Sequence, residues 1–264
     1  MGRAEAKKPT RWRLWTNVAL SCVALGFVIY AGRKVRQFVT TDPRFTLASP
    51  DDRAAGLSMR GLVHASRYRV LSAFSRDFGR SVFLVPVAER RRRLLAVDWV
   101  EDAYIARVWP NQVEVRIKER KPVAFVNLAA THGTASRVML IDAEGVLLEP
   151  PASSHFAFPV LSGVTEEQTE AERSRRVHAM LRLLEDLGTE GSDISEVNAA
   201  SPENLMIVTQ IEGAAVELVM GNRNFSRRLH NFLDHFSEIQ RRSGGVRAFD
   251  LRLDDRITAG TEAR

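Results

Sequence analysis

Apolar and charged residues alternate in the stretch from Tyr104 to Phe125. The alternating positions are Val113, Glu114, Val115, Arg116, Ile117 and Lys118. Because successive side chains of a strand point to opposite faces, this period of two predicts a strand with one buried face and one solvated face. A similar run ends at Trp109, and Pro110 follows it. Proline cannot adopt the positive φ of a primed two-residue turn, so the pattern predicts a hairpin with a wider loop.

Residues 14–32 form the longest apolar run and contain no charged side chain. As a helix they would extend about 28 Å, close to the thickness of the hydrocarbon layer of a bilayer. The pattern predicts a single transmembrane helix that binds the lipid bilayer. The tail 1–13 is basic, which favours a cytoplasmic N-terminus and export of the remaining chain. Residues 33–56 are polar and contain two prolines, so we expect a tether.

Between the tether and the hairpin, the pattern predicts a strand near 57–63 and helices near 68–78 and 87–97. The second helix contains four consecutive arginines, Arg90 to Arg93. Four consecutive residues turn through more than one helical turn, so they cannot share one face. We therefore expect a solvated helix surface rather than a contact with lipid or a partner.

The second half of the chain predicts a β-rich domain with helices packed on an antiparallel sheet. Strand patterns form hairpins within 138–148 and 205–220, and apolar stripes at helical spacing lie in 172–187 and 224–240. A final strand is expected at 246–251; the edge of the sheet is one possible place for it, because strand order is not readable from the period. The fold class is therefore α+β.

The sequence shows no recognisable catalytic or metal-binding motif. The sequence contains no nucleophile elbow, phosphate-binding glycine loop or paired-histidine zinc motif, and Cys22 is its single cysteine. His230 and His235 are five residues apart and do not share a helix face. The net charge of +6 is dispersed, and no nucleic-acid reader motif accompanies it. We expect no catalysis, cofactor, metal, nucleic acid or small-molecule substrate.

The order strand, helix, helix, strand, strand resembles that of a POTRA module, and several motifs resemble the FtsQ/DivIB family of bacterial cell-division proteins. The residues that carry this resemblance are Trp99, Val100, Ala103, Arg107, Trp109, Pro110, Asn111, Glu119, Arg120, Pro122, Val123 and Ala124, then Leu140, Ile141, Asp142, Gly145, Val146, Pro159, Val160, Leu161 and Gly163, and finally Phe249, Asp250, Leu251 and Arg252. With the basic tail and the single span, the resemblance covers nearly the whole chain. Leu253 departs from the aromatic residue that is frequent in the family at that position.

The resemblance implies a POTRA domain at 57–121, a β-rich FtsQ/DivIB-type domain at 122–258 and a tail at 259–264. It further implies a scaffold of the divisome in the cytoplasmic (inner) membrane at the septum. Its POTRA domain would contact other division proteins, and the end of its second domain would bind small bitopic proteins of the FtsB/FtsL type. The residues predicted to bind that partner are Phe249, Leu251, Arg252, Leu253, Asp255 and Ile257. At the domain junction, Glu119 and Arg120 are expected to fix one domain against the other.

Two alternative functions remain at this stage. One is a membrane-tethered cell-wall enzyme whose site has no recognised motif. The other is a POTRA-type export or assembly factor, although such factors usually lead into a β-barrel and the strands of one are not evident here.

Overall fold

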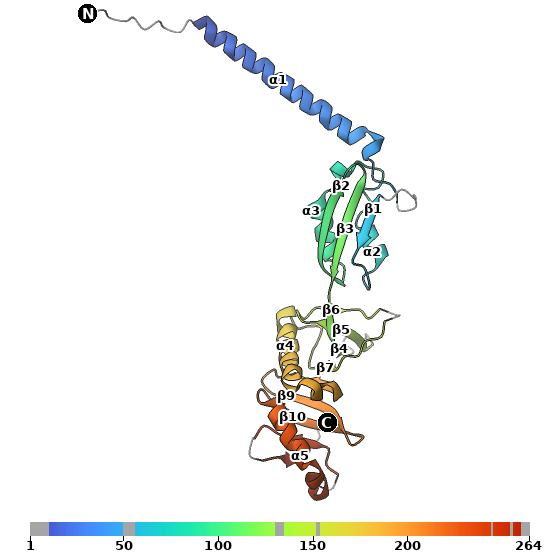
Figure 1. Cartoon of the computed structure of the whole chain (residues 1–264), viewed down its shortest axis with the longest axis vertical. Coiled ribbons are helices and arrows are strands. Elements are labelled where there is room, and N and C mark those ends of the chain that lie inside the picture. The colour runs from blue at the N-terminus through green and yellow to red at the C-terminus, as the bar shows by residue number, and fades with distance from the viewer. Residues whose placement is uncertain are drawn as a thin grey trace, which may run out of the picture. The chain divides into compact units, whose positions relative to one another are not determined.

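Helix α1 (Arg11–Thr41) is the candidate membrane span (Figure 1). The computed structural model describes residues 11–49, 56–129, 135–151, 154–243, 245–253 and 256–259. Within these, α1 is the one helix long and apolar enough to cross a bilayer. It is longer than the predicted 14–32, because the arginines and lysine that follow residue 32 are compatible with a helix. The helix ends before Pro43, where the short 3-10 helix η1 (Pro43–Phe45) begins.

The predicted tether is therefore wrong over part of its length. Its first residues belong to α1, and Phe45 and Leu47 are buried in the core that follows. The amide of Leu47 donates to the carbonyl of Arg80 at 2.8 Å, and the amide of Gly79 donates to the carbonyl of Leu47 at 2.9 Å. These bonds incorporate residues 45–47 into the folded domain.

The chain divides into two units, residues 1–119 and 120–264, called here the first and second units. After α1, the first unit contains a three-stranded sheet in the order β1-β3-β2. Its further elements are β1 (Leu57–Arg60), α2 (Arg67–Ser72), η2 (Val82–Leu84), α3 (Val87–Leu95), β2 (Val100–Val108) and β3 (Gln112–Glu119). Strand β3 pairs parallel with β1 and antiparallel with β2. This is the predicted β-α-α-β-β order.

The hairpin of β2 and β3 follows the predicted pattern. Val113, Val115 and Ile117 are buried, whereas Arg116 and Lys118 are exposed. The last pair of the ladder joins residues 108 and 112, which leaves a three-residue loop with a cis bond before its proline. The expectation of a loop wider than two residues is confirmed.

Arg90 corrects the prediction that the arginine run forms a solvated surface. Its side chain is 3% exposed, and it donates from Nε and Nη2 to the two carboxylate oxygens of Asp77, at 2.6 and 3.0 Å. Asp77 is 1% exposed, so both charges are withdrawn from water. Arg91 to Arg93 do lie at the surface. One arginine of the four is thus part of the core of the first unit.

The second unit is built on a nine-stranded sheet in the order β12-β11-β10-β9-β8-β7-β4-β5-β6. Its strands are β4 (Pro122–Leu128), β5 (Arg137–Asp142), β6 (Leu147–Leu148), β7 (Val160–Ser162), β8 (Ile194–Asn198), β9 (Leu205–Ile211), β10 (Ala214–Gly221), β11 (Ala248–Asp250) and β12 (Thr258–Ala259). The β4–β7, β7–β8 and β10–β11 pairs are parallel. The sheet is therefore mixed rather than wholly antiparallel, while the predicted hairpins are present.

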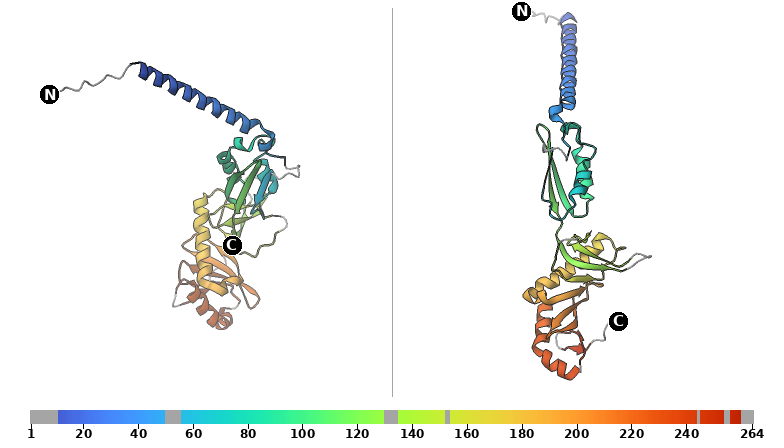
Figure 2. Two further views of the ribbon diagram at one scale, coloured as in Figure 1. Left: turned by 45° about the horizontal axis from the view of Figure 1, so that its top comes forward. Right: turned by 90° about the vertical axis from the view of Figure 1, so that its right-hand side faces the viewer.

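Helices α4 (Glu170–Leu187) and α5 (Phe225–Ser243) lie along this sheet (Figure 2). The first turn of α4 has a capping box, in which the Thr169 side chain and the Glu172 side chain satisfy each other's backbone amides. The apolar stripes of both helices enter one hydrophobic core with the inner faces of the strands. Their buried members include Val177, Met180, Leu183, Leu229, Phe232 and Phe236.

Glu119 and Arg120 occupy the boundary between the two units. The Glu119 carboxylate accepts the backbone amides of Val63, His64 and Ala65 at 2.7 to 3.0 Å. The Arg120 guanidinium donates to the Asp142 carboxylate at 2.8 Å. Each of these contacts lies within its own unit, and the prediction that the two residues fix one domain against the other stays a prediction.

Candidate functional site

The candidate site lies where the large sheet ends, at strands β11 and β12. Strand β11 pairs parallel with β10 on one side and antiparallel with β12 on the other. The 246–251 strand is therefore not at the edge, because β12 covers it. Strand β12 contains two residues, both exposed, and no described strand pairs with its outer side. The described sheet thus ends in an unpaired backbone edge.

Two of the six predicted partner-binding residues belong to the core. Phe249 is 1% exposed and its ring centroid lies 5.1 Å from that of Phe232 on α5, while Leu251 is 2% exposed. Their burial shows that both side chains pack in the core, while the partner-binding role of the six residues stays a prediction. An internal strand covered by a helix places its alternate side chains inside, so Phe249 is enclosed in the core and Leu251 reaches only the wall of the cavity described below.

The remaining predicted residues lie at the surface or outside the described chain. Leu253 is 51% exposed, which leaves an apolar side chain in solvent. Arg252 is exposed and Ile257 is half-buried against the core. Asp255 and the residues after 259 fall outside the described residues.

Arg228 positions this segment, and the sequence patterns did not single it out. The side chain is 7% exposed although it lies on α5. Its Nη1 donates to the carbonyl of Met220 at 2.7 Å, and its Nη2 donates to the carbonyl of Arg252 at 2.7 Å. One guanidinium therefore connects α5, the end of β10 and the chain after β11. The sequence signal was its place within the apolar stripe between Phe225 and Leu229, a position where a solvated arginine is not expected.

Gly221 allows this arrangement. Its φ is +73°, a backbone conformation that side-chain-bearing residues rarely adopt. A Cβ at this position would lie 3.0 Å from Nη1 of Arg228 and 3.4 Å from Cγ of Arg252. The positive φ thus favours glycine, and the absence of a Cβ also leaves room for the Arg228 guanidinium.

Asp250 and Arg252 form a local ion pair at the end of β11. Arg252 donates from Nη2 to Oδ2 of Asp250 at 2.6 Å, and its backbone amide donates to Oδ1 at 2.9 Å. The side-chain hydrogen bonds from Arg252 hold the pKa of the Asp250 carboxyl below its usual range. The bonds keep the backbone bent between β11 and Leu253.

Acidification should therefore loosen this bend. Because the pKa of Asp250 is depressed by folding, its stabilisation is present above the unfolded value of about 3.9 and is lost as the pH falls through the lower folded value. We expect lower protection factors at the amides of 251–253 below pH ~4, measured by mass spectrometry as exchange rates relative to the intrinsic amide rate at each pH. An Asp250→Asn variant should exchange rapidly at neutral pH and lose the pH dependence in this segment. Unchanged protection in that variant would contradict the role assigned to the carboxylate.

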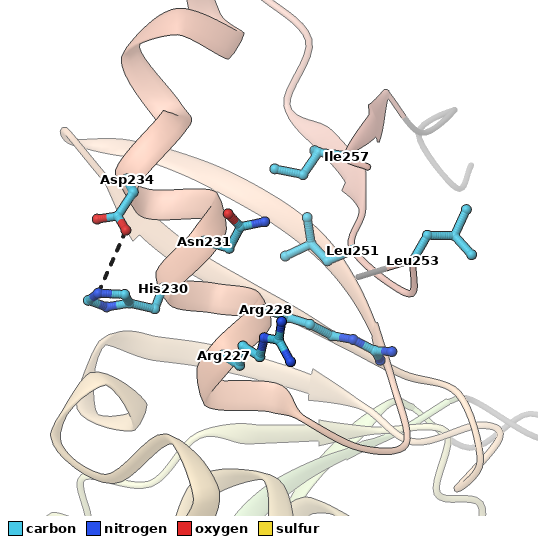
Figure 3. A pocket seen from close by; sticks show the side chains of 8 residues that line it. All are labelled: Arg227, Arg228, His230, Asn231, Asp234, Leu251, Leu253 and Ile257. Carbon is cyan, nitrogen blue, oxygen red and sulfur yellow. Dashed lines mark ion pairs between the residues drawn. The ribbon is translucent and has the colours of Figure 1, made fainter. Parts of the chain in front are cut away.

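A cavity of about 260 Å³ separates α5 from the segment that follows β11 (Figure 3). Its lining residues are Arg227, Arg228, His230, Asn231, Asp234, Leu251, Leu253 and Ile257. Ile257 is directed toward α5 (Figure 3). His230 lies 3.7 Å from the Asp234 carboxylate on the outer side of the helix. Apolar side chains surrounded by charged and amide groups are the composition of a protein-binding surface.

The described residues of this site form a surface suited to binding, and they do not form a recognisable reaction centre. Across the described ranges, no group of three or more histidine, cysteine or acidic side chains could hold a metal ion. His230 and His235 are both exposed on α5. One candidate membrane span, a sheet edge and an exposed leucine beside it fit the class of single-pass membrane proteins that bind other proteins.

Comparisons with known proteins agree with this class. Residues 55–120 match the FtsQ-type POTRA domain, and residues 130–252 match the C-terminal domain of the cell division protein FtsQ/DivIB. The cell division protein FtsQ of Koribacter versatilis is 31% identical over 250 residues, which cover 91% of this chain and 69% of the relative. The FtsQ proteins of Geobacter sp. strain M21 and Shewanella oneidensis are 24% and 22% identical, over 95% and 96% of this chain and 90% and 88% of their own lengths.

The chain belongs to the FtsQ/DivIB family of bacterial cell-division proteins. The predicted family and the predicted POTRA fold of the first unit are confirmed. Family membership places the protein among the interacting membrane proteins of the division septum.

Proposed function

We propose that this protein is a non-catalytic scaffold of the divisome, anchored by α1 in the cytoplasmic membrane with its N-terminus inside the cell. The basic tail before the span supports this orientation, since basic residues near a span are retained on the cytoplasmic side. Both folded units would then be exported. The POTRA unit contacts other division proteins, and the end of the second unit binds small bitopic proteins of the FtsB/FtsL type.

The observation that carries the partner proposal is the exposed outer side of β12. Backbone amides and carbonyls at a sheet edge are hydrogen-bonding groups that a strand of another chain can pair with. Leu253 supplies an exposed apolar side chain close to that edge, and it also lines the cavity against α5. A partner strand would gain affinity from the backbone and specificity from these side chains.

Leu253→Asp should weaken capture of the FtsB/FtsL-type pair without unfolding the second unit. Loss of a central apolar contact costs about 2 kcal/mol, which is about 30-fold in affinity. Capture is measured with the full-length chain in detergent, and folding is checked by thermal denaturation. The matched control is Val138→Asp, because Val138 is 57% exposed on β5, toward the opposite end of the sheet.

Leu253→Pro tests the same contact through the backbone. Equal recovery of the pair by the wild-type, Leu253→Asp and Leu253→Pro chains would rule out this contact. Cleavage of peptidoglycan by the purified chain would instead favour the tethered enzyme.

A further inference from the structure

We propose that the end of the first unit next to α1 inserts aromatic side chains into the headgroup layer of the bilayer that α1 spans. We call this surface the aromatic end. It contains Phe38 of α1, Phe45 of η1, Phe83 and Leu84 of η2, and Val108 and Trp109 at the tip of the β2–β3 hairpin. The inference adds a second membrane contact to the transmembrane anchor and does not depend on the partner proposed above.

The rings of the aromatic end form a connected group around Phe45. The centroid of the Phe45 ring lies 5.7 Å from that of Phe38, 5.4 Å from that of Phe83 and 6.5 Å from that of Trp109. Phe45 is 6% exposed, but Trp109 is 74%, Phe38 50% and Phe83 43% exposed. The aromatic group therefore has one ring, that of Phe45, buried in the core, and its other rings are exposed to solvent. Single exposed apolar residues are ordinary, whereas a joined aromatic group marks a contact surface.

A hydrogen bond and a ring contact connect the aromatic end to the last turn of α1. The hydroxyl of Ser81 is buried and donates to the carbonyl of Val39 at 2.8 Å. Phe38 on the helix reaches Phe45 across this contact. Figure 1 shows the start of β3, and hence the hairpin tip, at the end of the first unit where α1 arrives. The height of the aromatic end is thus set by the position of α1 in the membrane.

The length of α1 places that last turn at the membrane surface. Its 31 residues extend about 46 Å at 1.5 Å per residue. A bilayer with its headgroup layers is about 40–45 Å thick. A helix whose start is at one surface therefore ends at the other surface. Arg33, Lys34 and Arg36 can extend their charged groups to the phosphates while their aliphatic stems stay in the apolar layer.

The chemistry of the aromatic end suits a lipid headgroup layer better than a protein partner. Tryptophan is enriched in this layer, because its ring is apolar and its N–H still reaches water or lipid oxygens. Arg44 is exposed, with its guanidinium carbon 5.5 Å from the Phe38 ring centroid. The Arg44 guanidinium is paired with the Asp42 carboxylate at 2.9 Å, so an ion pair and not a free cation lies beside the exposed rings, and it is the rings themselves that favour lipid. The surface is also continuous with a helix that is already surrounded by lipid.

Spin labelling of the full-length chain in vesicles of phosphatidylethanolamine and phosphatidylglycerol tests the proposal. A single cysteine is introduced at Val108, in a Cys22→Ser background, and carries a nitroxide. The matched control is Val63→Cys, because Val63 is also an exposed valine but lies beside Glu119, at the other end of β3. Collisions with oxygen, which concentrates in hydrocarbon, and with a water-soluble nickel chelate measure the depth of each label.

We expect the label at 108 to be several-fold less accessible to nickel and more accessible to oxygen than the label at 63. Adding Phe83→Ser and Trp109→Ser should make the label at 108 accessible to nickel, with the thermal transition of the first unit retained. If the two labels are equally accessible to nickel, the proposal is wrong. If the label at 108 is protected from both reagents, it is buried in protein, and a second copy of the chain rather than the bilayer covers the surface.

Discussion

Replacing Arg90 by methionine should lower the free energy of unfolding of the first unit by about 3–5 kcal/mol. The substitution leaves the Asp77 carboxylate, which is 1% exposed, buried without its guanidinium partner. Removing one member of a buried ion pair is costly, because the remaining charge has lost its solvation and gains nothing in return. All four tryptophans of the chain lie in the first unit, so tryptophan fluorescence during urea unfolding reports on this unit alone.

Arg92→Met is the matched control, since Arg92 lies in the same helix and is exposed. Its effect should stay within about 0.5 kcal/mol, as for most surface substitutions. Combining Arg90→Met with Asp77→Leu removes both charges and should recover part of the loss. Equal stability of the Arg90→Met and Arg92→Met chains would contradict a structural role for the pair.

Phe249→Ala should destabilise the second unit by about 3–5 kcal/mol, because it removes a fully buried ring and leaves a cavity. The ring lies against Phe232 of α5 and is 1% exposed. Because no tryptophan lies in this unit, its opening is measured by hydrogen exchange at the amides of β9 and β10. Leu253→Ala, an exposed leucine in the adjoining segment, should change stability by no more than about 0.5 kcal/mol.

The pair of variants separates a folding residue from a contact residue. Phe249→Ala should reduce partner capture only to the extent that the unit unfolds, so capture should return on cooling. Leu253→Ala should reduce capture with the unit intact. A Phe249→Ala chain that keeps full stability but loses the partner would show that Phe249 itself is the contact, as its sequence position first suggested.

Local patterns predicted most of the fold, because each depends on residues close together in the chain. The alternation of Val113, Val115 and Ile117 identified β3 and its buried face, and the stripe containing Phe232 and Phe236 identified α5. The burial of Arg90 could not be predicted in this way. Its partner Asp77 is 13 residues earlier, and only the folded chain brings the two together.

At the candidate site, the sequence predicted a strand but not the elements that pack around it. A period of two identifies a strand yet does not say which neighbours cover it, so the burial of Phe249 and Leu251 was missed. Strand β12 has two residues, too few to show any period, and its pairing made β11 internal. Arg228 lies within the apolar stripe of α5, but its role could not be predicted, because it depends on the backbone carbonyls of Met220 and Arg252, which side-chain type does not encode.

The contacts of Glu119 and Arg120 also decide where the chain can be cut for separate expression of its domains. A fragment of the first unit that stops at Lys118 lacks Glu119, whose carboxylate accepts hydrogen bonds from three successive amides at 63–65. A second-domain fragment that starts at Lys121 leaves the buried carboxylate of Asp142 without Arg120. The peptide bond between these two neighbours is therefore the one division that leaves both fragments with their own stabilising contacts.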